Sequence, residues 1–277
     1  MLYIVSTPIG NLKDITLRAL DVLKEVDLIA AEDTRHSQKL LDHYLIKTPL
    51  TSLHDHNERQ KHHQLIQKIQ SGQSVALISD AGTPLISDPG YQFVLAAREA
   101  NIKVLTVPGC SALIAALSIS GLPSDAFSFY GFLAAKSVAR KKVLESLLHN
   151  RETLIFYESP HRIIHCLEDM KEVLGEKRFV VLARELTKTY ETVHGDTLDN
   201  LLQWIREDEN QQRGEFVVLV RGDEAEQDQS LQEAITVYKI LKEELPMKQA
   251  VKLAAKITNV KKNELYTAAL AASGLED

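Results

Sequence analysis

The segment that most constrains the fold of this chain is the run 79–90, Ser-Asp-Ala-Gly-Thr-Pro-Leu-Ile-Ser-Asp-Pro-Gly. It follows an apolar run of strand length at 75–78 and precedes apolar residues that recur at helical spacing from Phe93 to Ala100. Its two glycines, two prolines and two aspartates disfavour regular structure and favour a tight loop. Open α/β sheets bind ligands at such strand ends, although a purely structural turn has the same composition.

The order of strand, polar loop and helix recurs through the N-terminal half of the chain. The expected strands are residues 1–5, 28–31, 75–78 and 102–107. Thr16 and Ser111 stand where N-caps of the following helices are expected. This alternation predicts an α/β fold with a mainly parallel sheet and helices on both faces. The strand-end loops then converge on one edge of the sheet.

The C-terminal half predicts a second α/β domain and a helical segment. Turn residues at 121–125 indicate a hinge. The expected strands of the second domain are residues 127–131, 153–157, 179–184 and 215–220, in a mixed sheet, with an antiparallel hairpin possible within 185–196. An acidic linker at 223–228 precedes a helix-turn-helix pattern. We therefore expect an N-terminal α/β domain at 1–121, a second α/β domain at 122–222, and a linker with terminal helices at 223–277.

The composition limits the classes of function. No apolar run reaches membrane-spanning length, and the N-terminus lacks a signal-peptide pattern. Cys110 and Cys166 match no metal or disulfide framework, so we expect reduced thiols and a cytoplasmic protein. The net charge is −6, but residues 131–151 and the terminal helices each carry a local charge of +4. Such patches suit either a solvated face or contacts with phosphates.

Two other kinds of site are disfavoured. Residues 54–59 and 62–63 contain four histidines, but no cysteine or His-Glu-x-x-His helix accompanies them. We interpret 54–59 as a solvated or substrate-facing loop and expect no metal. Neither glycine-rich phosphate-binding motif is present. Asp80 suits an amine or a hydroxyl better than a phosphate, which its charge would repel.

Taken together, the motifs resemble the ribosomal RNA small subunit methyltransferase I family, a branch of the tetrapyrrole methylase superfamily. The motifs are residues 6–12, 31–35, 79–90, 107–112, 157–162 and 183–191. The resemblance covers almost the whole chain, including the terminal helices. It implies two α/β domains with a cofactor cleft between them, S-adenosylmethionine as cofactor, and methyl transfer to the ribose 2′-hydroxyl of a cytidine in small-subunit (16S) ribosomal RNA. It also implies a homodimer.

The resemblance assigns roles by position in the motifs. The implied cofactor-binding residues are Pro8, Ile9, Gly10, Asp80, Gly82, Thr83, Ser111, Ala112, Tyr157 and Ala183. A ribose hydroxyl is a weak nucleophile, so a base would help, and Asp33 and Glu158 stand at predicted strand ends. Each of the two could instead be a helix cap or an ion-pair partner. The cations expected to contact RNA are Lys13, Arg35, Arg162 and Lys188 near the cleft, and Lys248, Lys252 and Lys256 on a terminal helix.

Two rival functions stay open on the sequence alone. One is a tetrapyrrole C-methyltransferase, the activity that names the superfamily. The other is a non-catalytic RNA-binding module of the ribosome that keeps a cofactor-like pocket only by descent. The terminal helices with their lysine stripe favour RNA over a tetrapyrrole.

Overall fold

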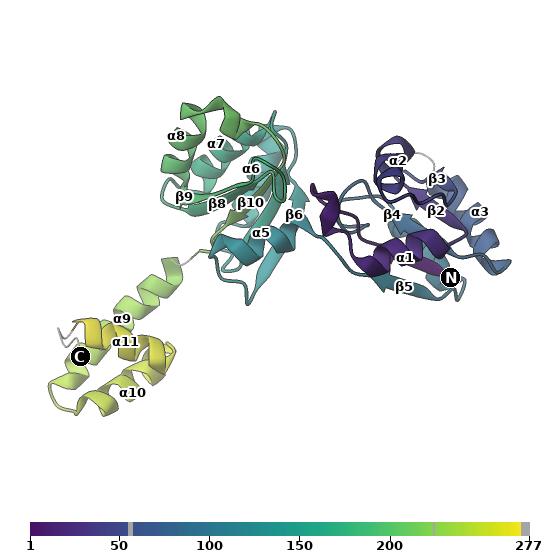
Figure 1. Cartoon of the computed structure of the whole chain (residues 1–277). Helices are drawn as coiled ribbons and strands as arrows, with labels where there is room; N and C mark the ends of the chain where they lie inside the picture. The colour runs from purple at the N-terminus through teal and green to yellow at the C-terminus, as the bar shows by residue number, and fades with distance from the viewer. Residues whose placement is uncertain (55–57, 224, 273–277) are drawn as a thin grey trace. The chain divides into compact units, whose positions relative to one another are not determined.

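The computed structural model describes residues 1–54, 58–223 and 225–272. The chain forms two compact units. The larger unit comprises Met1–Leu148 and Glu152–Arg221 and contains two five-stranded sheets, and the smaller comprises His149–Arg151 and Gly222–Asp277. Figure 1 labels the elements of both units.

The first sheet was predicted to be mainly parallel, and all the pairings between its strands are parallel. Its strands are β1 (Leu2–Val5), β2 (Leu28–Ala31), β3 (Leu50–Ser52), β4 (Val75–Ile78) and β5 (Val104–Val107). They lie in the order β3-β2-β4-β1-β5. The edge strand β3 was not predicted, because three residues that include Thr51 and Ser52 present no apolar run.

The helices of the first half cover both faces of this sheet. Helices α1 (Leu17–Glu25) and α2 (Thr34–His43) pack on one face, and α3 (Glu58–Gln70) and α4 (Tyr91–Glu99) pack on the other. The hydroxyl of Thr16 caps α1 as predicted, accepting a hydrogen bond from the N–H of Ala19. The neighbouring strands β1 and β4 therefore lead to helices on opposite faces. Their loops diverge at the kind of point where open α/β sheets bind ligands.

The second sheet is mixed, as predicted. Its strands are β6 (Phe127–Phe132), β7 (Thr153–Glu158), β8 (Phe179–Arg184), β9 (Thr192–Thr197) and β10 (Phe216–Val220), in the order β6-β7-β10-β8-β9. Only β6 and β7 pair in parallel. An antiparallel hairpin is present, but only its second arm, β9, comes from the segment 185–196 in which a hairpin was possible. Its first arm is β8, the strand expected at 179–184.

The two faces of the second sheet have different partners. Helices α6 (Ser137–Ser146), α7 (Ile163–Leu174) and α8 (Leu198–Glu207) cover one face. Helix α5 (Ala112–Ser120) packs on the other, in a cluster that also includes Ile9 from the loop after β1. Helix α5 thus follows the first sheet in sequence but packs on the second. The domain boundaries expected after residues 121 and 222 stay a prediction.

The smaller unit is helical. It contains α9 (Ala225–Lys242), α10 (Met247–Thr258) and α11 (Lys262–Ala272) around a small core that includes Tyr238, Val251 and Leu265. Asn259 ends α10 in the left-handed region at φ +57°, where a short polar side chain is tolerated. Lys248, Lys252 and Lys256 lie exposed along α10. No helix in the described part of the chain is long and apolar enough to cross a membrane.

Candidate functional site

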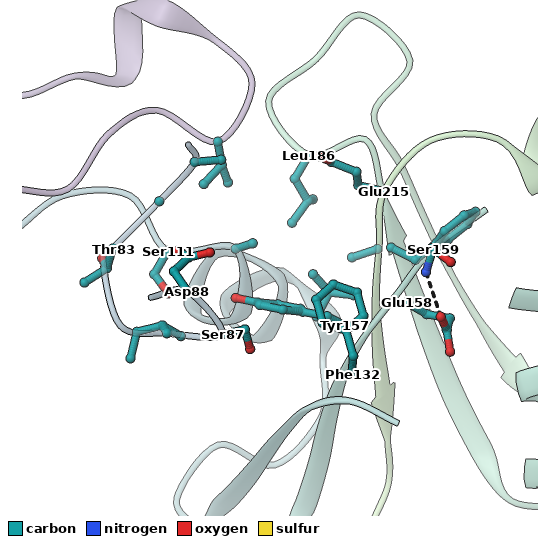
Figure 2. A pocket seen from close by; sticks show the side chains of 18 of the residues that line it. Thr83, Ser87, Asp88, Ser111, Phe132, Tyr157, Glu158, Ser159, Leu186 and Glu215 are labelled. Carbon is teal, nitrogen blue, oxygen red and sulfur yellow. Dashed lines mark hydrogen bonds between the residues drawn. The ribbon is translucent and has the colours of Figure 1, made fainter. Parts of the chain in front are cut away.

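A cavity of about 390 Å³ lies in the larger unit, between loops of the first half and strand ends of the second sheet (Figure 2). Seven of the ten predicted cofactor-binding residues line it: Ile9, Gly82, Thr83, Ser111, Ala112, Tyr157 and Ala183. Pro8, Gly10 and Asp80 are not among its lining residues. The prediction omitted further lining residues, among them Ser87, Asp88, Phe132, Ser159, Leu186 and Glu215.

Backbone pairing fixes the loop that follows β4. Thr7 and Gly82 form an antiparallel bridge, with N–H to carbonyl distances of 2.8 and 3.1 Å. Gly82 has φ +83°, a conformation that glycine adopts without strain. The hydroxyl of Thr83 donates to the carbonyl of Cys110 at 2.9 Å and also bonds the hydroxyl of Ser6 at 2.9 Å. Three strand-end loops are therefore linked side by side at the cavity.

Gly10 permits a close approach between the two halves of the unit. A Cβ at this position would lie 2.6 Å from Cγ of Lys188 and 3.0 Å from the carbonyl oxygen of Leu186. The N–H of Asn11 donates to Oγ1 of Thr187 at 3.0 Å. Gly10 therefore holds the loop after β1 against the loop that carries Leu186, which lines the cavity.

Unusual backbone conformations gather around the cavity. Leu85 and Ser87 in one loop and Glu185 and Thr187 in another have φ between +52° and +73°. These are four of the seven non-glycine residues with positive φ in the described ranges. Such conformations cost free energy and concentrate at ligand sites. No sequence signal marked them, because none of the four is glycine or asparagine.

Tyr157 is held at the cavity wall by a hydrogen bond to α5. Its hydroxyl oxygen accepts from the N–H of Leu113 at 3.3 Å. Burial raises the pKa of the Tyr157 hydroxyl, and the nearby charge of Asp88 adds to the effect. Ser111 occupies the N-cap position of α5 but makes no side-chain capping bond there. The predicted capping role of this hydroxyl is therefore wrong, and the Ser111 side chain lines the cavity instead.

Asp88 lines the cavity, whereas Asp80, the aspartate of this loop that the resemblance assigned to the cofactor, does not. Burial and, less strongly, the charge of Asp80 raise the pKa of the Asp88 carboxyl to about 6, against the opposing effect of a hydrogen bond with Ser79. Asp80 itself accepts a hydrogen bond from the N–H of Asp33 at 3.1 Å. Of the two aspartates in the loop, Asp88 is the one in contact with the cavity.

The two predicted base candidates are both engaged in other interactions. Both carboxylate oxygens of Asp33 accept from Arg35, at 2.8 Å and 3.0 Å, and these hydrogen bonds lower the pKa of Asp33 to about 2. Asp33 is the N-cap of α2 and does not line the cavity. Glu158 lines the cavity but is fully buried and forms an ion pair with Arg162 at 3.1 Å. It also accepts the N–H of Ser159 at 2.8 Å, so its carboxylate points away from Asp88 (Figure 2).

The predicted cations near the cavity differ in whether they are already paired with a carboxylate. Arg162 is bound to Glu158 and to the carbonyl of Leu133, and Arg35 to Asp33. Lys188 lies between Glu185 and Glu215, at 2.8 Å and 2.9 Å. Of these four cations, only Lys13 has no acidic partner among the described residues, and it is exposed.

The described residues contain no group of three or more His, Cys, Asp or Glu side chains arranged to hold a metal ion. His54, His62 and His63 are among the residues described. Asp55, His56 and Asn57 of the proposed histidine-containing loop lie outside the described residues.

Residues 1–202 match the family model of the tetrapyrrole (corrin/porphyrin) methylases. The chain belongs to the tetrapyrrole methylase family. The resemblance found in its motifs is thus confirmed, and so is the predicted fold class. Residues 228–273 of this tetrapyrrole methylase match a second model, the RsmI C-terminal HTH domain.

Curated relatives within the family are similar over nearly their full length. The ribosomal RNA small subunit methyltransferase I of Vibrio cholerae is 58% identical, over 96% of this chain and 93% of the relative. The protein of the same name from Escherichia coli O157:H7 is 56% identical, over 99% and 96%. The enzyme class is therefore methyltransferase.

Solved structures show the fold of this tetrapyrrole methylase in more distant proteins. Uroporphyrin-III-C-methyltransferase from Thermus thermophilus aligns with a TM-score of 0.57 at 22% identity, covering 79% of this chain and 93% of that chain. Diphthine synthase aligns with a TM-score of 0.60 at 17% identity, covering 79% and 89%. The names of these two proteins indicate different products, so the fold alone does not identify the acceptor.

Proposed function

We propose that this protein is an S-adenosylmethionine-dependent methyltransferase that methylates the ribose 2′-hydroxyl of a cytidine in small-subunit (16S) ribosomal RNA. The observation that carries the proposal is identity of 56–58%, over nearly the full length, to proteins named ribosomal RNA small subunit methyltransferase I. A tetrapyrrole as acceptor is less well supported, because the uroporphyrin enzyme is only 22% identical and covers 79% of the chain.

The cavity fits the proposed cofactor in size and chemistry. Its volume of about 390 Å³ lies within the usual range of small-molecule sites, about 300–1,000 Å³. Ile9, Ala112 and Ala183 provide an apolar surface for an adenosyl group, and Gly82 lets its backbone approach a ligand closely. The acidic Asp88 suits a cationic ligand rather than a phosphate. When bound, S-adenosylmethionine supplies an activated methyl group for transfer to a nucleophile.

The protein's own contribution is chiefly orientation and exclusion of water. Loops from both sheets surround the cavity and are fixed by the Thr7–Gly82 bridge and by the Leu113–Tyr157 hydrogen bond. Positioning of reactants can supply a large part of the acceleration of a displacement reaction. We propose that Glu158 acts by holding Ser159 and Arg162 in place, since its oxygens accept from both.

The exposed lysines are proposed to contact phosphates of the RNA. Lys248, Lys252 and Lys256 lie four residues apart on α10 and are exposed. The match of this segment to a helix-turn-helix domain model supports a role in binding nucleic acid. Lys13 is the proposed phosphate contact near the cavity, because Arg35, Arg162 and Lys188 are already paired with carboxylates.

We also propose a homodimer in the cytoplasm, where its RNA substrate is found. The edge strand β6 leaves Phe127, Tyr130 and Phe132 exposed by 39%, 40% and 55%. Exposed apolar side chains along an unpaired strand edge favour association with another chain. Sedimentation of the purified protein tests this part of the proposal. A monomer at micromolar concentration would contradict it.

Transfer of labelled methyl groups from S-adenosylmethionine tests the function. Three acceptors should be compared: assembled small subunits, naked small-subunit RNA and a tetrapyrrole precursor. We expect label in RNA, on the 2′-hydroxyl of a cytidine, from at least one of the first two acceptors. Label only in the tetrapyrrole would support the rival methyltransferase. No binding of S-adenosylmethionine by calorimetry would favour a non-catalytic RNA-binding module.

A further inference from the structure

Asp88 differs from the other carboxylates in the cavity wall. The wall contains three, namely Asp88, Glu158 and Glu215. Glu158 is paired with Arg162 at 3.1 Å, and Glu215 with Lys188 at 2.9 Å. Asp88 has no cationic partner among the described residues. It is therefore the one wall carboxylate whose charge the rest of the described chain leaves uncompensated.

The surroundings of Asp88 make this charge costly. The side chain is half-buried, and the neighbouring ionisable group on its own loop is Asp80, another acid. The hydroxyl of Tyr157, on β7, faces the carboxyl of Asp88. Ser79, the first residue of the loop, forms a hydrogen bond with the same carboxyl. Ala112 at the start of α5 adds apolar surface. A half-buried carboxylate in such surroundings attracts a positive charge, because water screens it poorly.

We propose that the carboxylate of Asp88 is the counter-ion of a cationic group of the ligand that this cavity binds. The inference rests on the proposed function and deepens it. S-adenosylmethionine carries two positive groups, an ammonium and a sulfonium, and its demethylated product S-adenosylhomocysteine keeps only the ammonium. 5′-Methylthioadenosine carries neither. These three compounds therefore distinguish which positive group Asp88 neutralises.

The pairing makes ligand affinity depend on pH. In the free protein the pKa of Asp88 is about 6, and a bound cation lowers it, because the cation stabilises the ionised form. Affinity for the cation is then greatest well above pH 6, where the Asp88 carboxyl of the free protein is fully ionised. As the pH falls below 6, protonation of the free protein competes with binding, and affinity declines by up to about tenfold per pH unit.

Calorimetry of the full chain with each compound, at pH 5.0 and 7.5, tests the inference. For the wild type we expect tighter binding of S-adenosylmethionine at pH 7.5. In Asp88→Asn the affinity at pH 7.5 should fall about tenfold or more and the pH dependence should flatten. Equal weakening for S-adenosylmethionine and S-adenosylhomocysteine assigns the ammonium as the partner. Weakening for S-adenosylmethionine alone assigns the sulfonium.

The controls separate a charge effect from a loss of structure. Asp88→Glu keeps the charge and should keep the pH dependence, and Asp21→Asn, an exposed position on α1, should bind as the wild type does. Asp88→Asn should bind 5′-methylthioadenosine like the wild type, and equal weakening for that compound would overturn the inference. So would unchanged affinity of Asp88→Asn for S-adenosylmethionine. A wild type that binds none of the three overturns the proposed function itself.

Discussion

The hydroxyl oxygen of Tyr157 accepts a hydrogen bond from the backbone N–H of Leu113, across 3.3 Å. This contact joins the end of β7 to the first turn of α5, whose N–H groups have no partner within the helix. The Tyr157 ring also meets Phe129 and Phe132 edge-on, at 4.9 Å and 5.7 Å between centroids. Both the hydroxyl and the ring of Tyr157 are therefore held in place where the side chain lines the cavity.

Replacing Tyr157 with Phe should weaken both the fold and ligand binding. The N–H of Leu113 loses its partner, so we expect the free energy of unfolding to fall by about 1 kcal/mol, the net value of one hydrogen bond. Affinity for S-adenosylmethionine should fall severalfold, because the wall of the cavity loses its anchor. Urea denaturation and calorimetry measure the two effects. An unchanged affinity together with lower stability would show that the contact is only structural.

Replacing Gly82 with Leu should abolish cofactor binding while the chain still folds. The position has φ +83°, and a Cβ there would lie 3.3 Å from Cγ2 of Ile9, which lines the cavity. Gly72→Leu is a matched control, since Gly72 has φ +102° but no atom within 4 Å of the added Cβ. Both variants should lose similar stability in thermal unfolding. Only Gly82→Leu should lose affinity, and an equal loss in both would contradict the role of Gly82.

Variants of the ion pair between Glu158 and Arg162 can distinguish a structural role of Glu158 from a role as the catalytic base. Glu158→Gln removes one charge of a largely buried pair, which costs on the order of 3 kcal/mol. Adding Arg162→Met should restore much of that stability, because the unpaired guanidinium is then gone. Urea denaturation of the three variants measures this. If Glu158→Gln keeps its stability and cofactor affinity but loses turnover by a hundredfold or more, Glu158 is the base instead.

Asp33 should contribute to stability in a defined pH range. Its folded pKa of about 2 lies below the ordinary value of 3.8, mainly because Arg35 donates to it. A lowered carboxyl pKa means that the contribution is present above pH 3.8 and is lost as the pH falls through 2. Acid unfolding of the wild type should show this loss, and Asp33→Asn should lack it. Identical acid unfolding curves would contradict the pairing with Arg35.

Much of the architecture could be predicted from the sequence because most of the strands are marked by their own local pattern. The run 75–78 is apolar throughout and became β4, and the hydroxyl of Thr16 capped α1 where a cap was expected. The short edge strand β3 carried no such pattern. The packing of α5 on the second sheet depends on contacts with residues more than thirty positions away, such as Val181, which no local pattern reports.

The candidate site was predictable only as far as motifs fix backbone position. Gly82 and Thr83 line the cavity because they sit in the loop that the motif defines. The motif pointed to Asp80, whereas Asp88 lines the cavity, and the positive φ of Leu85 and Ser87 between the two aspartates is not marked in the sequence. It likewise could not show that Glu158 faces Arg162, because ion pairing depends on side-chain direction. Charged side chains near a site are thus the least predictable part of it.

Neutralising the lysines of α10 should reduce RNA affinity and its dependence on salt. Lys248, Lys252 and Lys256 are exposed on one stripe, so replacing all three with Gln removes three potential phosphate contacts. Each phosphate contact contributes about 0.7 to the salt slope for single-stranded nucleic acid, so the slope should fall by about 2. Filter binding to small-subunit RNA over a series of salt concentrations measures it. Calorimetry should show unchanged affinity for S-adenosylmethionine.

A matched triple variant decides whether the position of these charges matters. Lys24, Lys68 and Lys103 are also exposed but belong to the first half of the larger unit, and replacing them with Gln changes the net charge by the same amount. If binding depended on net charge alone, both triples would lower the salt slope equally, and α10 would have no special role. A contact surface on α10 instead predicts a lower slope only for the α10 triple, because counterions are released only where phosphates are neutralised.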